Sequence, residues 1–212
     1  PSANFEARNG QLDLVCSNNQ QYRNISATFM PTDFKGYMEI TLSGAGAIGN
    51  GNFGFQFENA PVLISATENP PSSASIAMLS GNVVTSAITV QVGCTPPFVA
   101  GDTIMLAWDF TGGVRNAWFG RNGTWGTNPG GVGDPATGAN PSLTNVHITQ
   151  PSRFVLTQNT GGAAVTLSMN AGQRPFTFTP PTNFKALCTD NLPVPAIPAG
   201  NKQFLPRLRT GT

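Results

Sequence analysis

The amino-acid sequence predicts an all-β protein, built as a sandwich of two antiparallel sheets. Short segments in which apolar and polar residues alternate recur along the chain, as expected for strands with one buried face. The segments between them are rich in turn formers, and the 212 residues include 24 Gly and 18 Pro. No segment places apolar residues at helical spacing between helix caps. Many short strands joined by turns are typical of a sandwich.

The first half of the chain contains four alternating segments and one irregular region. Pro61, Pro70 and Pro71 interrupt residues 58–82. Because proline is excluded from central strands, we predict only a short edge strand at residues 62–64 within long loops there. The alternating segments, each predicted to be a strand, cover residues 12–16, 38–42, 53–57 and 84–92. In the last of these, one predicted buried face consists of Val84, Ile88, Val90 and Val92.

The clearest strand signal lies in GDTIMLAWDF, residues 101–110. Residues Thr111-Gly112-Gly113 tolerate the positive φ of a reversal, so residues 114–119 are predicted to return as a second strand before Arg121-Asn122-Gly123 turns again. Alternation sorts the first strand into two faces. The face predicted to lie in the core holds Ile104, Leu106, Trp108 and Phe110, and the opposite face holds Thr103, Met105, Ala107 and Asp109.

The last predicted strand covers residues 163–169, with Val165, Leu167 and Met169 inward. A chain of this length is long enough for one sizeable core, so we expect a single domain over residues 1–192. Residues 193–212 are rich in proline and form a predicted extended linker or docking arm. Because the sequence begins with Pro1 and not Met, we expect it to be a piece of a longer product.

The arm carries apolar side chains that need a surface to cover. We therefore expect it to act between chains, through Phe204, Leu205 and Leu208. Its cations, Lys202, Arg207 and Arg209, are more typical of a solvated tail than of a nucleic-acid site.

Composition excludes several classes of function. The net charge is +1 and 10% of residues are charged, so no basic surface for nucleic acid is expected. No apolar run approaches the length of a membrane helix, and we expect no membrane insertion. Cys16, Cys94 and Cys188 are widely spaced and follow no zinc-binding pattern, so we expect free thiols, no metal and no cofactor.

Two blocks of the sequence resemble a SPRY domain of the type found in bacteriophage tail-fibre and other virion structural proteins. The first block combines GDTI (101–104), WFGRNGTW (118–125) and a Gly/Asn/Pro loop at 128–143. The second combines VTL (165–167), GQRPFTFTPPTNFKAL (172–187), which is similar to the family's closing strands, and NLP (191–193). Asn9–Leu12 and Gly36–Thr41 resemble the family's opening strands more weakly.

The resemblance implies a concanavalin-like sandwich and a non-enzymatic virion protein, part of a tail fibre or related component. Such a protein is assembled in the cytoplasm of the host bacterium. Its expected partners are other virion proteins, further copies of itself, or a glycan or protein of the host surface. The alternative is a carbohydrate-binding lectin or a polysaccharide-degrading tail protein.

The ionisable residues offer little support for catalysis. His147 lies in a strand-like segment without a nucleophile motif, so a structural role is expected. Asp102 is predicted to cap a turn, and Asp109 to lie opposite the core face near a hairpin. Asp134 belongs to a loop without the spacing of a calcium site. Arg174 is predicted to pair with a carboxylate or to cap carbonyl groups.

Binding is the function that the loops favour. Trp125 follows the Asn122-Gly123 turn, and we predict that it is the most exposed of the three tryptophans. Trp108 and Trp118 are expected to be packed. We therefore name Trp125, Arg121 and Asp134 as candidate binding residues. The predicted contact loops are residues 43–52, 68–82 and 126–143.

Overall fold

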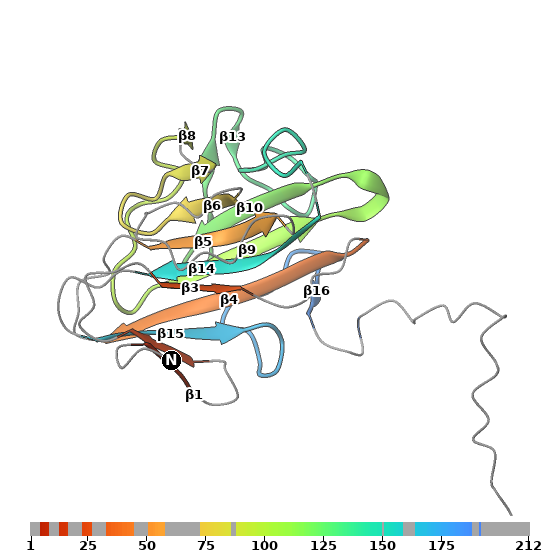
Figure 1. The fold of residues 1–212 in the computed structure, drawn as a ribbon. Helices are drawn as coiled ribbons and strands as arrows, with labels where there is room; N and C mark the ends of the chain where they lie inside the picture. The colour runs from red at the N-terminus through yellow and green to blue at the C-terminus, as the bar shows by residue number, and fades with distance from the viewer. Residues whose placement is uncertain are drawn as a thin grey trace, which may run out of the picture.

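The computed structural model describes residues 5–8, 13–16, 23–26, 33–44, 51–57, 73–85, 88–149, 151–158, 164–187 and 191. Its regular elements are strands, apart from the short 3-10 turn η1 (Thr111–Gly113). The all-β prediction is therefore confirmed, and the strands form the two antiparallel sheets of a sandwich (Figure 1). The predicted edge strand at 62–64 and the arm at 193–212 lie outside the described residues.

The larger sheet has the strand order β1-β2-β15-β4-β9-β10-β11, and β16 pairs in parallel with β4. Its long central strand β4 pairs with β9 on one side and with β15 on the other. The bounds of its strands are β1 Phe5–Arg8, β2 Asp13–Cys16, β4 Lys35–Gly44, β9 Thr103–Asp109, β10 Asn116–Arg121, β11 Thr124–Trp125, β15 Val165–Asn170 and β16 Lys185–Ala186.

The smaller sheet has the order β3-β14-β5-β6-β7-β8, and a separate ribbon joins β12 to β13. The bounds are β3 Arg23–Ser26, β5 Asn52–Phe57, β6 Ser73–Ala77, β7 Val83–Thr85, β8 Ile88–Gln91, β12 Thr127–Asn128, β13 Gly131–Val132 and β14 Ser152–Gln158.

The core between the two sheets contains the apolar face predicted for β9. Ile104, Leu106 and Trp108 are fully buried there, and Phe110 follows them. The Trp108 ring packs edge-on against Phe154 of the smaller sheet, with 4.8 Å between ring centroids. The inward positions of β4 and β15 complete the large-sheet side of this core. The strand pattern of the sequence therefore identified the inner face correctly.

The opposite face of β9 is buried too, which the sequence did not predict. Residues 171–187, here called the strap, cross the outer face of the larger sheet between β15 and the end of β16. Phe176, Phe178 and Phe184 of the strap pack on a second apolar cluster. The strap is mostly irregular, so of the closing strands that the sequence resemblance implies, the structure forms β15 and β16. The cluster under the strap consists of Tyr37, Met105, Ala107, Trp118 and Trp125.

A buried glutamate holds the strap to the sheet. Glu39 of β4 is 1% exposed and accepts hydrogen bonds from the backbone N–H groups of Thr177 and Phe178, both at 2.8 Å. The hydroxyl of Tyr37 donates a third bond at 2.9 Å. Burial is the main reason why the pKa of Tyr37 is raised, with the Glu39 carboxylate adding to it. The Tyr37 hydroxyl therefore stays a donor to Glu39.

Two predictions about the smaller sheet are wrong. Residues 84–92 are not one strand, because Thr85 pairs with Ile88 across a reversal, and β7 and β8 form a hairpin with a bulge between Val83 and Val84. Of the predicted buried face, Val84 is buried and Val90 is half-buried against the core, but Ile88 is 65% exposed and Val92 81% exposed. Residues 73–77, expected in a loop, form the interior strand β6 between β5 and β7.

The predicted reversals around β10 are confirmed. Gly112 and Gly113 adopt φ of 59° and 82°, which suits glycine. Asn122 and Gly123, with φ of 51° and 84°, join β10 to β11 as a two-residue hairpin turn. The second strand begins at Asn116, two residues later than expected.

Candidate functional site

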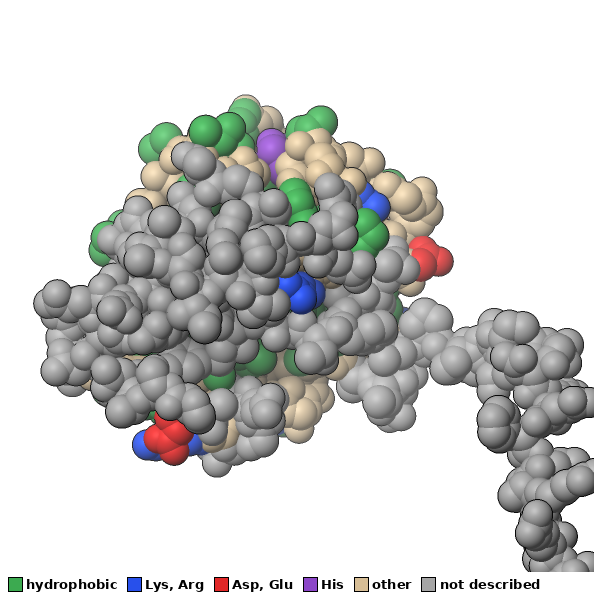
Figure 2. Space-filling model, viewed as in Figure 1, with side chains coloured by type: hydrophobic (Ala, Val, Ile, Leu, Met, Phe, Trp, Pro, Cys, Tyr) green, Lys and Arg blue, Asp and Glu red, His purple; other side chains and the backbone are tan. Residues whose placement is uncertain are grey.

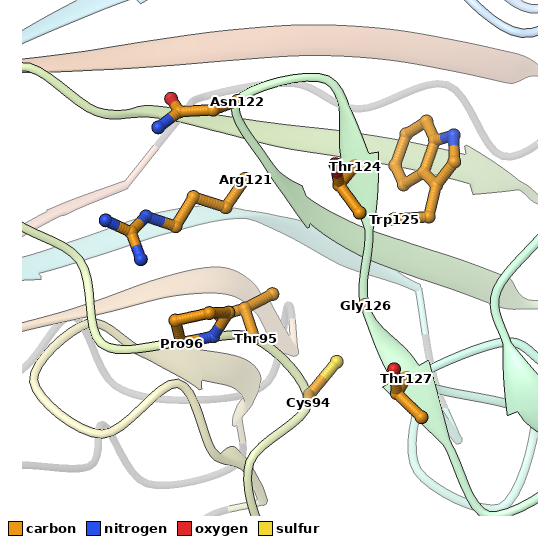
Figure 3. A pocket seen from close by; sticks show the side chains of 9 residues that line it. All are labelled: Cys94, Thr95, Pro96, Arg121, Asn122, Thr124, Trp125, Gly126 and Thr127. Carbon is orange, nitrogen blue, oxygen red and sulfur yellow. The ribbon is translucent and has the colours of Figure 1, made fainter.

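An open pocket of about 320 Å³ lies where the β10–β11 hairpin meets the segment that follows β8 (Figure 3). One wall comes from the hairpin and its continuation, and the other from residues 94–96. The pocket brings together two of the three candidate binding residues, Arg121 and Trp125. Its complete lining is Cys94, Thr95, Pro96, Arg121, Asn122, Thr124, Trp125, Gly126 and Thr127.

Arg121 is positioned by a carboxylate beneath it. Its Nε lies 2.7 Å from Oδ2 of Asp102, whose side chain is 6% exposed. Burial alone would raise the pKa of Asp102, but the Val99 N–H, Arg121 and Asn122 together lower it. Asp102 therefore caps the turn at Val99, as predicted, and also fixes the arginine. The remaining N–H groups of Arg121 bond to no described residue, so they are available to a ligand.

Some of the other polar groups of the pocket already form hydrogen bonds within the protein, and some do not. Asn122 is used at both ends, because Oδ1 accepts from the Thr103 N–H at 2.8 Å and Nδ2 donates to Asp102 at 2.6 Å. The hydroxyl of Thr95, a residue only 4% exposed, has no hydrogen-bond partner among the described residues. Thr124 and Thr127 are exposed. The unused groups that face solvent are therefore the hydroxyls of Thr124 and Thr127 and the remaining N–H groups of Arg121, while the Thr95 hydroxyl is buried.

Trp125 contributes to the pocket differently from the prediction. Arg121 pairs with Thr124 and Gly120 with Trp125, so the arginine and the indole leave opposite faces of the hairpin. Figure 3 shows the two side chains diverging in this way. The half-buried indole instead packs edge-on against Tyr37 on the strap side, with ring centroids 6.4 Å apart. Its aromatic face therefore belongs to the outer cluster of the larger sheet.

Asp134, the third candidate, does not line the pocket. Its carboxylate accepts bonds from the backbone N–H of Ala136 at 3.0 Å and from the hydroxyl of Thr137 at 2.8 Å. The Thr137 hydroxyl is the main reason why the pKa of Asp134 is lowered. The residue closes an ordered turn that is bridged to Ala139. This arrangement explains Asp134 as a structural residue of the loop at 126–143.

Three other ionisable residues considered in the sequence, His147, Asp109 and Arg174, also have structural partners. His147 lies in a turn and not in a strand, and its Nδ1 accepts from the Thr144 N–H at 3.1 Å. Desolvation lowers the pKa of His147. Asp109 pairs with Lys35 at 2.7 Å. Arg174, as predicted, meets a carboxylate and caps a carbonyl: its Nη2 lies 3.9 Å from Asp13 and donates to the Met169 carbonyl at 3.1 Å.

The long segment that leads into the pocket lining has no charged side chain. Between Glu68 and Asp102 the sequence contains no Asp, Glu, Lys, Arg or His. Exposed apolar residues lie on the segments that adjoin the pocket lining, and hydrogen bonds join these segments to one another. The Phe98 N–H donates to the Met78 carbonyl at 2.9 Å, and the Gln91 amide donates to the Thr127 carbonyl. The exposed fractions are Leu79 53%, Val92 81%, Val99 54% and Val132 59%.

We call these four residues and the pocket the apolar rim. Figure 2 shows hydrophobic side chains along the upper left edge of the molecule, in the area of β7 and β8, without Lys, Arg, Asp or Glu side chains among them. The hairpin β7–β8, loop 126–143 and residues 78–82 meet here, which links the described parts of two of the predicted contact loops. Surface apolar residues gathered in one place are typical of an interaction site.

The described residues form neither a cluster of metal ligands nor a helix that could span a membrane. No three or more His, Cys, Asp or Glu side chains come together there as metal ligands. No helix among those residues is long and apolar enough to span a membrane. Cys16 and Cys94 are buried free thiols, and burial raises the pKa of Cys16 to about 12. Cys188 lies outside the described residues.

Comparison with solved structures shows the fold. The chain aligns with a human SPRY domain at a TM-score of 0.51 and 15% identity, covering 77% of this chain and 96% of that one. It aligns with the SPRY domain of human HERC1 at a TM-score of 0.53 and 13% identity, covering 81% and 94%. The sandwich is therefore SPRY-like. A search of protein-family models and a search of curated proteins returned no match.

Sequence reasoning missed three contributors to this region: Glu39, Thr95 and the apolar rim. Glu39 left a signal, since it is an acid within a strand whose neighbours on both sides are apolar. The rim left a signal in the uncharged segment before Asp102. Thr95 left none, because a buried unpaired hydroxyl depends on packing between segments distant in sequence.

Proposed function

We propose that this chain is a non-enzymatic interaction module of a bacteriophage virion, part of a tail fibre or related component, and that it binds a protein partner through the apolar rim. The SPRY-like sandwich supplies a rigid scaffold that presents loops at the sheet ends. The virion assignment rests on the sequence resemblance over the blocks at 101–143 and 165–193.

One observation carries the choice of surface. Four exposed apolar side chains lie on the segments next to a pocket that holds an arginine with unused N–H groups, and the charge of this arginine is paired with Asp102. Protein interfaces combine an apolar centre with a few oriented polar groups, and arginine is enriched in them. The pairing of Arg121 with Asp102 makes the site neutral overall, which favours an uncharged partner surface over an acidic one.

The glycan-binding alternative is weakened by the position of Trp125. An aromatic ring stacks on a sugar through its exposed face, and this indole packs on Tyr37 under the strap. No other tryptophan serves, since Trp108 and Trp118 are buried.

Immunogold labelling of purified phage particles with an antibody against this chain tests the virion assignment. Labelling confined to the tail fibre or an adjoining structure is the expected result, and particles without label contradict it. For the surface, biosensor binding to the purified neighbouring virion proteins should fall in Val92→Asp and stay normal in Val146→Asp. Val146 is 76% exposed and lies outside the rim, so it is a matched control.

A glycan array with the same chain separates the alternative. If the chain binds a bacterial polysaccharide specifically and Val92→Asp does not change this binding, then the rim is not the functional surface and the glycan-binding alternative holds.

A further inference from the structure

We infer that the apolar rim of one copy binds the proline-rich arm of a second copy, through residues 193–198. This inference rests on the proposed function of the rim and names its partner. It predicts a head-to-tail contact, because the rim and the arm are different surfaces of the same chain.

The hydrogen-bonding groups of the two surfaces are complementary. Residues 193–198 read PVPAIP, so half of them lack a backbone N–H while all six have a carbonyl group. Extended proline-rich segments make no internal hydrogen bonds, which leaves these carbonyls free as acceptors. The pocket offers what such a segment needs: the unused N–H groups of Arg121 and the exposed hydroxyls of Thr124 and Thr127.

The side chains and the charges match as well. Val194 and Ile197 are the apolar residues between the prolines, and residues 193–201 contain no charged side chain. The rim has the same character: Val92 and Val99 lie along the chain on either side of the pocket-lining residues 94–96, Val132 pairs with Thr127, and Leu79 follows Met78, whose carbonyl accepts from Phe98. Proline restricts the arm before binding, so less conformational entropy is lost when it docks.

Strand geometry favours a second copy over the same chain. Ala186 pairs with Tyr37, Tyr37 with Ala107, and Ala107 with Trp118, three residues before Arg121. At ~4.8 Å between strands and ~3.3 Å per residue, Ala186 lies about 17 Å from Arg121. Asn191 is bonded to the Ala186 carbonyl at 3.1 Å. Pro193, two residues later, reaches at most about 7 Å beyond Asn191, so within one chain only the far end of residues 193–198 could come near the pocket, whereas the arm of a second copy can lie across it along its whole length.

Sedimentation velocity on the full chain and two charge variants tests the inference. Wild type should associate with increasing concentration. Val92→Asp blocks the rim and Ile197→Asp blocks the arm, and each should weaken association at least about tenfold because a carboxylate would be buried without a partner. Val146→Asp should behave like wild type. An equimolar mixture of the two blocked variants should form a one-to-one dimer, since each supplies the surface that the other lacks.

Three results would overturn the inference: a wild-type chain that stays monomeric, association that Val92→Asp or Ile197→Asp leaves unchanged, or a mixture that remains monomeric while wild type associates. Failure here is distinguishable from failure of the proposed function. A monomeric wild type whose binding to a virion protein is lost in Val92→Asp refutes the arm as the partner and keeps the rim as the interaction surface.

Discussion

At the scale of single residues, one close contact explains why position 36 is glycine. A Cβ built on Gly36 would lie 2.0 Å from Cζ2 of Trp108, whose ring fills the core. Overpacking usually costs about 1–3 kcal/mol and more where the surroundings cannot move. Gly36→Ala should therefore lower the free energy of unfolding by about 3 kcal/mol, measured by urea denaturation.

Gly93→Ala is the control for this substitution. Gly93 has φ of +64°, and no atom lies within 4 Å of the place that an alanine methyl group would take, so alanine there adds backbone strain without a clash. Its expected cost is about 1–2 kcal/mol. Equal losses in the two variants would show that the Trp108 contact is not what excludes alanine at position 36.

Asp102 makes stability depend on pH. Burial would raise its pKa in the folded protein, but hydrogen bonds and Arg121 outweigh burial and lower it. A depressed folded-state pKa contributes stability above the unfolded value of about 3.9, and this is lost as pH falls through the folded value. Asp102→Asn should cost about 1.5–3 kcal/mol at neutral pH. The melting temperatures of the two proteins should converge in acid, and a constant difference would contradict this reading.

At the scale of elements, β9 is unusual because both of its faces are packed. Leu106→Ala should lower the free energy of unfolding by about 2–5 kcal/mol, as for other emptied core sites. Met105, 2% exposed and under the strap, should show a loss in the same range when changed to Ala. Chemical denaturation measures both. A Met105→Ala variant as stable as wild type would show that the strap does not cover the sheet.

The strap depends on the Glu39 carboxylate. Gln at position 39 keeps one acceptor oxygen and introduces an NH2 group facing a backbone N–H, so one of the two strap bonds is lost. In Glu39→Gln, amide hydrogen exchange at Thr177 and Phe178 should accelerate by at least about tenfold. Thr177→Ala retains its backbone N–H and should exchange like wild type. Unchanged protection in Glu39→Gln would show that the aromatic residues alone hold the strap.

The sequence predicted the inner face of this sandwich well, and the reasons for its failures are physical. In β9 the alternation of Ile104, Leu106 and Trp108 with Thr103, Ala107 and Asp109 identifies the core face, although Met105 on the outer face is itself apolar. It does not distinguish a solvated outer face from one covered by an irregular strap. Thr85 of β7 pairs with Ile88 of β8, but the sequence between them is Ser-Ala, without Gly, Asn, Asp or Pro, so a hairpin looked like a single strand.

The candidate site was predicted only in part, for a related reason. The Asn122-Gly123 signal placed a turn correctly and therefore located Arg121 and Trp125 near a loop end. Which face each side chain takes depends on the register of the hairpin, and one residue of shift reverses it. The contribution of residues 94–96 depends on a hydrogen bond between Cys94 and Thr127, which no local pattern encodes.

At the scale of the whole molecule, the arm should add little to the stability of the sandwich. The last described residue, Asn191, is already bonded to β16. A chain truncated after Leu192 should keep the melting temperature of the full chain within about 2 °C, since no described core contact is removed. The same truncation should abolish self-association. A truncated chain that fails to fold would show that residues 193–212 belong to the sandwich itself.

The strap also determines the order in which this molecule can be completed during synthesis. The aromatic face formed by Tyr37, Trp118 and Trp125 exists once β11 has left the ribosome, but the strap that covers it ends only at residue 187. At about 5–20 residues per second, that surface stays bare for several seconds. During this interval the nascent chain exposes an aromatic surface that is covered in the finished protein. Chaperones that bind exposed apolar surface would act on the chain at this stage.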